Sequence, residues 1–309
     1  MIDFSKNPLA LAPLAGYTDL PFRKVVKKFG ADLTYSEMIS SNALVYQNKK
    51  TLKMLEKSPL ETPYIVQIAG SNKDIIKEAV LILNDIDGID GIDLNCGCPV
   101  PKVVSQDAGS SLLLDLPKLK EILQTIKKYS KKRYLSAKVR LGFEEKIPKL
   151  IAQTCEEAGV DFISMHGRTR ADKYKKVIDY DAIKEARKAV NIPMFANGDI
   201  TSLDIALHVK NHTKCEGLMI GRGAVGNPWI FYQIKNNDKI LDGSIKHQII
   251  MEHFDAMVEF YGKRGVSIFR KHLHTYSKGY VQASKFRDEI NKIEDIKEAR
   301  DRVDDFFSI

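Results

Sequence analysis

The chain has 309 residues, of which 44% are hydrophobic and 28% charged, and this balance suits one large domain, a smaller one and ample core. No apolar run approaches the about eighteen residues that a membrane span needs, and the N-terminus lacks the features of a signal peptide. Four cysteines without a disulfide-like framework fit a reducing compartment, so we expect a cytoplasmic protein. The net charge of +8 permits a nucleic-acid partner without requiring one.

Apolar runs that are typical of strands recur through the first three quarters of the chain. They lie near residues 8–14, 31–36, 63–69, 89–95, 133–140, 161–166, 192–197 and 216–221. Between them, apolar residues at three- and four-residue spacing predict helices. Eight strands that alternate with helices over roughly 240 residues predict an α/β protein with a (β/α)8 TIM barrel. A doubly wound sheet is the structural alternative.

The pattern changes after Trp229, where only helices are predicted. One helix is expected from Ile245 to Tyr261 and a second around residues 267–278, followed by shorter pieces. We therefore divide the chain into a barrel domain, residues 1–240, and a small C-terminal helical domain, residues 241–309.

The segment at residues 93–99 reads Asp-Leu-Asn-Cys-Gly-Cys-Pro and follows a predicted strand. Chemistry in parallel barrels takes place at the carboxyl ends of the strands, so a cysteine here is a candidate acid or nucleophile. Most cysteines in soluble proteins are instead small buried hydrophobic residues. A metal site is also conceivable, but no second cysteine pair or nearby histidine completes a ligand set, and we predict no metal.

Polar residues also follow the other predicted strands. Lys138 and Arg140 are two residues apart in an apolar strand, so both side chains point to the same face of that strand. If that face is the barrel interior, the two cations need an anionic or polar ligand. The alternative is that both side chains reach outward. The predicted loops at 197–199 and 221–223 supply glycines and a cation for a phosphate group. Flavin mononucleotide (FMN) fits this arrangement, with its ring near Gln67 and Lys138.

Together these motifs resemble the tRNA-dihydrouridine synthase family, most closely its bacterial B-type branch. The resemblance covers essentially the whole chain. Its motifs lie at residues 12–19, 21–23, 36–38, 67–71, 93–102, 108–110, 138–140, 166–170, 196–200, 219–223, 226–229 and 270–272.

The resemblance implies an FMN enzyme that reduces a uridine of tRNA to 5,6-dihydrouridine, with NADPH or NADH as reductant and Cys98 as the catalytic cysteine. The expected cofactor contacts are Pro13, Leu14, Ala15, Gln67, Lys138, His166, Asn197, Gly198, Asp199, Gly221 and Arg222. The expected substrate contacts are Asn95, Arg140, Arg168, Arg270, Lys271 and His272. The family usually has Met in place of Leu14 and of Cys96, so a second thiol lies near Cys98 in the sequence. We expect no obligate protein partner and no membrane partner.

The chemistry of the reaction suits a thiol. Reduction of the uracil 5,6 double bond needs a hydride at one carbon and a proton at the other, and reduced flavin would deliver the hydride to C6. A cysteine thiol is mostly protonated at neutral pH, so we expect Cys98 to donate the proton to C5.

The uridine must be flipped out of the tRNA, and residues 263–287 are suited to hold the remainder. This segment contains seven Lys or Arg and no Asp or Glu. Its interleaved aromatic residues, which could stack on bases, are Phe269, Tyr276, Tyr280 and Phe286. The alternative is an amphipathic helix with an aromatic core and solvated lysines.

Three other functions stay open at this point. The chain could be a flavin-dependent reductase of a free pyrimidine, although a small substrate needs no basic helical appendage. It could be a non-catalytic RNA-binding barrel, although the polar residues at the strand ends are all present. It could also be an aldolase that uses Lys138 to form a Schiff base.

Overall fold

The strands form one parallel sheet that curls into a barrel. The computed structural model describes residues 1–173 and 175–308. Within them the strands are β1 (Leu9–Leu11), β2 (Thr34–Tyr35), β3 (Ile39–Ser40), β4 (Tyr64–Ala69), β5 (Gly91–Cys96), β6 (Tyr134–Arg140), β7 (Phe162–His166), β8 (Met194–Asn197) and β9 (Gly217–Ile220). Their order is β1-β9-β8-β7-β6-β5-β4-β2, with β3 beside β4, and a bridge between Ala10 and Leu33 brings the two ends of the sheet together. The predicted TIM barrel is confirmed, and the doubly wound alternative is wrong.

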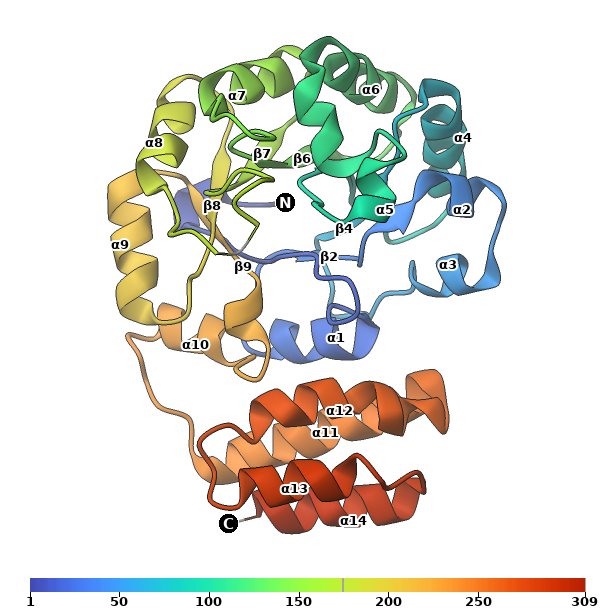
Figure 1. The fold of residues 1–309 in the computed structure, drawn as a ribbon, viewed down its shortest axis with the longest axis vertical. Helices are drawn as coiled ribbons and strands as arrows, with labels where there is room; N and C mark the ends of the chain where they lie inside the picture. The colour runs from blue at the N-terminus through green and yellow to red at the C-terminus, as the bar shows by residue number, and fades with distance from the viewer. Residues whose placement is uncertain (174, 309) are drawn as a thin grey trace.

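Helices surround the barrel (Figure 1). They are α1 (Leu20–Lys28), α2 (Ser41–Val45), α3 (Lys49–Lys53), α4 (Lys73–Asn84), α5 (Pro101–Val104), α6 (Leu116–Tyr129), α7 (Pro148–Glu157), α8 (Tyr180–Lys188), α9 (Leu203–Thr213) and α10 (Ile230–Lys235). Helix α6 shows why they form. The Asp115 side chain accepts a hydrogen bond from the Lys118 backbone N–H at its start, and apolar residues at three- and four-residue spacing form its buried face.

The alternation of side chains along the strands separates two cores. On β4, Ile65 packs inside the barrel with Phe162 and Phe195, whereas Val66 packs outward against the helices. Phe4, from a short 3-10 helix, contacts Phe162 and Phe195 with ring centroids 5.6 and 5.7 Å away. The barrel is therefore filled by side chains on its amino-terminal side, and its carboxyl end is left for a site.

Among the described residues, four helices follow the barrel: α11 (Gly243–Tyr261), α12 (Arg264–Tyr276), α13 (Ala283–Ile290) and α14 (Ile296–Phe307). The two helices predicted here are confirmed. Helix α11 lies along α1, where Lys28 pairs with Glu252 and the Tyr261 hydroxyl donates to the Asp19 carboxylate over 3.1 Å (Figure 1). No helix in the described part of the chain is long and apolar enough to cross a membrane.

The aromatic residues of the segment 263–287 form the core of this helical domain. Phe269, Tyr276 and Phe286 are buried, and the Phe286 ring stacks on Phe306 at 4.0 Å. Tyr280 packs against Phe306 and Phe307. The prediction that these rings stack on bases is therefore wrong, because they hold the helices together instead.

Candidate active site

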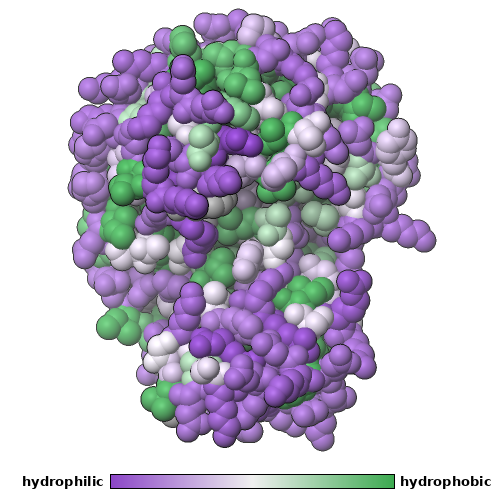
Figure 2. Space-filling view, viewed as in Figure 1, coloured by the Kyte–Doolittle hydropathy of each residue, from purple (hydrophilic) through white to green (hydrophobic). Residues whose placement is uncertain are grey.

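A cavity of about 750 Å³ lies at the carboxyl end of the barrel, within the size range of ligand pockets. Figure 2 shows this face of the molecule hollowed between the barrel and the helical domain, with hydrophobic residues in the hollow. The structure brings every residue predicted to contact the cofactor to the lining of this cavity, together with Cys98, Asn95 and Arg140. That these residues contact a cofactor or substrate stays a prediction.

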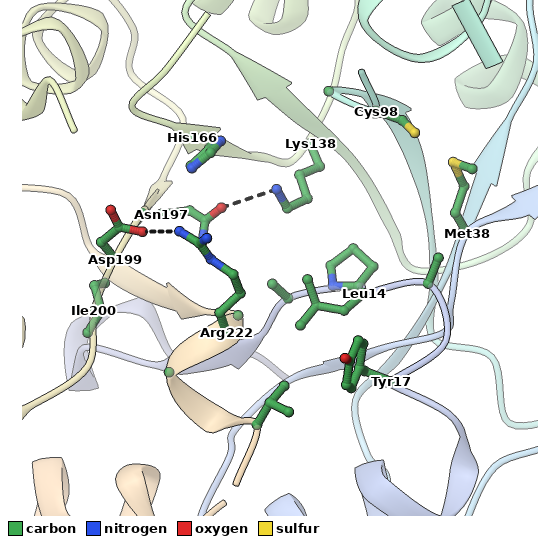
Figure 3. Close-up of a pocket in the computed structure, with 18 of the residues that line it drawn as sticks. Leu14, Tyr17, Met38, Cys98, Lys138, His166, Asn197, Asp199, Ile200 and Arg222 are labelled. Carbon is green, nitrogen blue, oxygen red and sulfur yellow. Dashed lines mark hydrogen bonds and ion pairs between the residues drawn. The ribbon is translucent and has the colours of Figure 1, made fainter. Parts of the chain in front are cut away.

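Strand register places the polar side chains on common levels of the barrel. Asn95 lies beside Lys138, and His166 lies between Arg140 and Asn197. Lys138 Nζ donates to Asn197 Oδ1 over 3.2 Å (Figure 3). Lys138 and Arg140 therefore point inward, as one of the two sequence-based alternatives proposed.

Burial determines the charge of the groups in the cavity. Burial, aided by the charge of Arg140, lowers the pKa of Lys138 to about 8, so the ammonium form still dominates at neutral pH. Burial, with the neighbouring Lys138, lowers the pKa of His166 well below its ordinary value. The imidazole is therefore neutral and offers one donor and one acceptor.

One end of the cavity is suited to an anion. Asp199 accepts hydrogen bonds from Arg168 over 2.5 and 3.2 Å and from Arg222 over 2.5 Å. Burial favours a raised pKa for Asp199, but the hydrogen bonds from the two arginines outweigh it and keep this pKa below its ordinary value. Two guanidinium groups therefore share one carboxylate, and the cluster has a net positive charge. The loops approach closely, since a Cβ on Gly223 would lie 2.1 Å from the Ile200 carbonyl oxygen.

Arg168 itself does not line the cavity. It is 3% exposed, and its guanidinium is bonded to Asp199 and to the Lys176 carbonyl oxygen. Its guanidinium is turned to the neighbouring loop, where it orients Asp199, and the substrate contact predicted for Arg168 stays untested.

The two neighbouring cysteines point in opposite directions. Cys98 is partly exposed and lines the cavity, whereas Cys96 ends β5 on the outward face, in the core between the sheet and the helices. Burial raises the pKa of the Cys96 thiol well above its ordinary value. Of these two, only Cys98 can meet a ligand in the cavity.

The loop that carries Cys98 is held from several sides. Arg140 donates to the Gly97 carbonyl oxygen over 2.7 Å and to the Thr169 carbonyl oxygen over 2.9 Å, which ties the loops after β5 and β7 together. Ser110 Oγ donates to the Cys98 carbonyl oxygen over 2.9 Å. These bonds give Arg140 a structural task at the edge of the cavity, and its predicted substrate contact stays untested.

Comparison with known proteins identifies the family. The family described as Dihydrouridine synthase (Dus) matches residues 10–308. The chain belongs to the dihydrouridine synthase family. It is 53% identical over 309 residues to a probable tRNA-dihydrouridine synthase of Helicobacter pylori (strain J99 / ATCC 700824), which covers 99% of this chain and 94% of the relative.

A B-type dihydrouridine synthase is also among the relatives of this protein. The chain is 38% identical over 312 residues to tRNA-dihydrouridine synthase B of Pseudomonas syringae pv. tomato (strain ATCC BAA-871 / DC3000), covering 98% of this chain and 92% of that one. An old yellow enzyme homologue from Zymomonas mobilis superposes with a TM-score of 0.51 at 12% identity, over 77% of this chain and 91% of the other. That likeness shows the TIM-barrel fold. The predicted family is confirmed.

The helical domain contributes to the cavity in a way that the sequence did not reveal. Thr275 and Lys278 line it, with Tyr17 and Met38 from the barrel. A Cβ on Gly226, whose φ is +80°, would lie 2.7 Å from the Thr275 side chain, so α12 lies against the loop after β9. Tyr17 and Met38 had a signal, since both lie in family motifs, but the docking of α12 had none.

The three residues of the segment 270–272 have different positions. Lys271 Nζ lies 5.3 Å from the centre of the Tyr17 ring, at the edge of the cavity. Arg270 donates to the Ile293 carbonyl oxygen over 2.8 Å, within the helical domain. His272 is 0% exposed and lies 5.1 Å from the Phe22 ring, between the two domains. The docking of α12 on the barrel buries the His272 side chain, and the tRNA contact that we predicted for it stays untested.

No group of three or more His, Cys, Asp or Glu side chains among residues 1–173 and 175–308 is placed to hold a metal ion.

A carboxyl group lies in the barrel interior beside these amides. Asp93 is 0% exposed, and it accepts hydrogen bonds from Ser136 Oγ over 2.6 Å and from Gln67 Nε2 over 2.7 Å. Burial raises the pKa of Asp93 to about 6, although these two bonds oppose the shift.

The buried Asp93 should make the stability of the protein depend on pH. Its pKa of about 6 in the folded chain exceeds 3.8, so it stabilises the fold below about pH 4 and this contribution is lost as the pH rises through 6. The loss amounts to about 3 kcal/mol. The substitution Asp93→Asn, which does not titrate, should therefore gain about 1–3 kcal/mol relative to the wild type between pH 5 and pH 8.

Urea unfolding of both proteins at pH 5, 6 and 8 measures this difference. Asp301→Asn, on the exposed surface of α14, is the control for general pH effects. A constant difference between D93N and the wild type over this range would show that Asp93 has the same charge in the folded and unfolded chains.

Proposed function

We propose that this protein reduces a specific uridine of tRNA to 5,6-dihydrouridine, with FMN as its cofactor and NADPH or NADH as reductant. Membership of the dihydrouridine synthase family supports the reaction, and relatives are named for tRNA as substrate. The observation that carries the proposal is one cavity with a cationic cluster at one end and the accessible Cys98 thiol at the other (Figure 3).

The residues present fit FMN. The net positive charge of the cluster around Asp199 and Arg222, with the close loops at Gly198 and Gly223, suits the phosphate. Pro13, Leu14 and Ala15 offer an apolar wall, and the Gln67 amide and Lys138 ammonium offer polar partners for the ring. When bound and reduced, the flavin supplies the hydride that the uracil ring needs at C6.

The side chains of this chain then provide the proton and the charge. Cys98 holds the proton for C5, at the edge of the cavity where the base would enter. The Lys138 ammonium stabilises negative charge that develops on a carbonyl oxygen. The neutral His166 can donate to a carbonyl oxygen or accept from a ring N–H without adding a second cation nearby.

The helical domain would bind the rest of the tRNA. Lys278 is exposed at the edge of the cavity, and Lys271 lies over Tyr17 beside it. Lysines here can bind phosphates on either side of a flipped nucleotide. Such contacts release counterions, so tRNA affinity should fall steeply with salt, and a flat dependence would contradict this assignment.

We expect Arg222→Met to weaken FMN binding about tenfold or more, because a charge-assisted contact to the phosphate is lost. Fluorescence quenching on titration of the flavin-free protein with FMN measures the affinity. Riboflavin, which lacks the phosphate, is the matched control ligand and should bind both proteins alike. Equal loss for both flavins would contradict the position of the phosphate.

An absorption experiment tests the proposed function. The purified protein, loaded with FMN, is reduced by NADPH without oxygen and then mixed with unmodified tRNA transcript. Return of the flavin colour with tRNA, and not with free uridine, is the expected result. Return with free uridine alone would indicate a reductase of small pyrimidines, and return with oxygen alone would contradict both substrates. Failure to bind flavin would instead favour the aldolase, which trapping of an imine on Lys138 would detect.

A further inference from the structure

A chain of side-chain hydrogen bonds runs from the barrel interior to the loop that carries Cys98. Gln67 Nε2 donates to Asp93 over 2.7 Å, and Asn95 Nδ2 donates to Gln67 Oε1 over 2.8 Å. Asn95 Oδ1 in turn accepts from the backbone N–H groups of Gly97 and Cys98, over 3.1 and 2.9 Å. The three side chains are 0 to 8% exposed, so water does not compete with these bonds.

The two ends of this chain fix the orientation of both amides. A backbone N–H can only donate, so the Asn95 oxygen must face the Cys98 loop and its nitrogen must face Gln67. The Gln67 oxygen then faces Asn95, and its nitrogen faces residue 93. Residue 93 must therefore accept a hydrogen bond, and an ionised carboxylate does only that.

We propose that Asp93 is a positioning residue for the reaction: it fixes the orientation of the Gln67 and Asn95 amides and, through them, the backbone that carries the Cys98 thiol. The inference rests on the proposed function for its catalytic meaning. Its structural meaning, a loop held from inside the barrel, does not depend on the substrate.

The same orientation determines what the cavity offers to a ligand. The hydrogen bonds to Asp93 and Gln67 use one N–H of each amide. Gln67 and Asn95 both line the cavity, so the second N–H of each is a donor for a ligand. Donors fit carbonyl oxygens, which the uracil edge and the pyrimidine part of a flavin both have. An amino group in the same place, as in cytosine, would be a donor facing a donor and would be rejected.

A purely structural role would not require a carboxylate here. Burial of a charge in the barrel opposes folding, and an apolar side chain of similar shape is often neutral or stabilising at such a position. Ser136 also donates to Asp93, so two donors converge on a group that destabilises the folded barrel at neutral pH. The ability of the Asp93 side chain to accept hydrogen bonds, rather than its volume, is therefore what orients the Gln67 amide.

Two substitutions that keep the number of side-chain heavy atoms separate these roles. Asp93→Leu keeps the branch point, adds some bulk and removes the acceptor. Asp93→Asn keeps an oxygen for Gln67 because Ser136 can accept from the new amide. The first measurement is alkylation of the flavin-free protein by iodoacetamide, followed by mass spectrometry of each cysteine. Only Cys98 of the four cysteines is not buried, so the label reports on its loop.

We expect D93L to change the labelling rate of Cys98 at least about threefold and D93N to bring it back toward the wild-type value. In single-turnover reactions, D93L should slow oxidation of the reduced flavin by tRNA at least about tenfold, because a small misplacement of the acid has a large effect on rate. D93N should recover most of that rate. Wild-type labelling and oxidation rates in D93L would overturn the inference.

A second pair of variants decides the matter if D93L does not fold. Gln67→Glu places two acceptors against each other, and the combination Q67E/D93N restores a donor between them. Recovery of the Cys98 labelling rate in the combination supports the inference, and equal labelling of Q67E and the combination overturns it. If the wild type itself is not oxidised by tRNA, the proposed function fails, while the labelling comparison still tests the position of the loop.

Discussion

Replacement of Cys98 by Ala should leave a folded protein that binds flavin and is reduced by NADPH, but that tRNA oxidises about 10²–10⁴-fold more slowly than the wild type. The reason is local. The thiol lines the cavity on a loop that Arg140, Ser110 and Asn95 hold by hydrogen bonds, and its removal takes away the proton donor without altering those bonds. Stopped-flow absorption of the reduced protein mixed with tRNA measures the rate of oxidation.

Cys96→Ala is the matched control for this prediction. Its side chain lies in the outer core, so the substitution should lower the free energy of unfolding by about 1 kcal/mol and leave the rate of oxidation near the wild-type value. A Cys98→Ala protein with a rate near the wild-type value would contradict the role of the thiol as acid. Loss of the rate in Cys96→Ala alone would assign the role to the other thiol.

The positions along the strands were predictable because a strand alternates its faces with a period of two. This rule places Asn95 inward and Cys96 outward, and it puts Lys138 on the same face as Arg140, which the strand pairing shows to be the inner one. The rule ends where the strand ends. Arg168 lies two residues beyond β7, and only the approach of the loop after β8 shows that its partner is Asp199.

The helical domain was predictable as helices but not as a partner of the barrel. The spacing of apolar residues shows that α12 has a buried face, and part of that face turned out to contact the barrel instead of its own domain. His272 is therefore enclosed, while Thr275, about one turn further on, and Lys278, just beyond the end of α12, reach the cavity. Two domains of one chain dock through side-chain shape, which periodicity does not encode.

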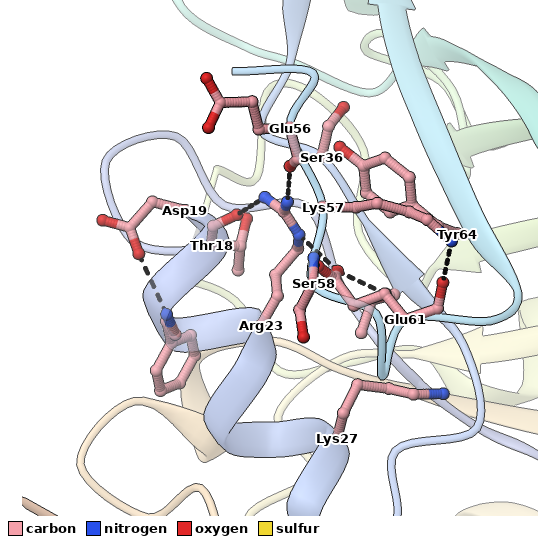
Figure 4. A network of polar contacts seen from close by, with 12 residues as sticks. Thr18, Asp19, Arg23, Lys27, Ser36, Glu56, Lys57, Ser58, Glu61 and Tyr64 are labelled. Carbon is pink, nitrogen blue, oxygen red and sulfur yellow. Dashed lines mark hydrogen bonds and ion pairs between the residues drawn. The ribbon is translucent and has the colours of Figure 1, made fainter. Parts of the chain in front are cut away.

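Substitution of Glu61 by Ala should lower the free energy of unfolding by about 3–5 kcal/mol, because it leaves the charge of Arg23 buried without its partner. The two side chains are 1 and 0% exposed, and Arg23 Nε donates to Glu61 over 2.7 Å (Figure 4). Glu61 also accepts from Thr34 Oγ1 over 2.9 Å and from the Ser58 backbone N–H over 2.8 Å. Urea unfolding followed by circular dichroism measures the change.

An exposed ion pair provides the control. Lys73 and Glu121 pair over 2.9 Å with about half of each side chain exposed, so Glu121→Ala should change the stability by less than about 1 kcal/mol. A loss in E61A as small as that in E121A would mean that water or another group replaces Glu61 beside the buried cation.

The double substitution Arg23→Met with Glu61→Leu shows where the loss originates. Removing both charges relieves the unpaired cation, so part of the stability lost in E61A should return. The return should be incomplete, because Arg23 also donates to the Thr18 and Glu56 carbonyl oxygens, over 2.9 and 2.6 Å. The bond to Thr18 holds the loop between β1 and α1, whose Tyr17 lines the cavity, so the double variant should also bind flavin more weakly than its stability alone predicts.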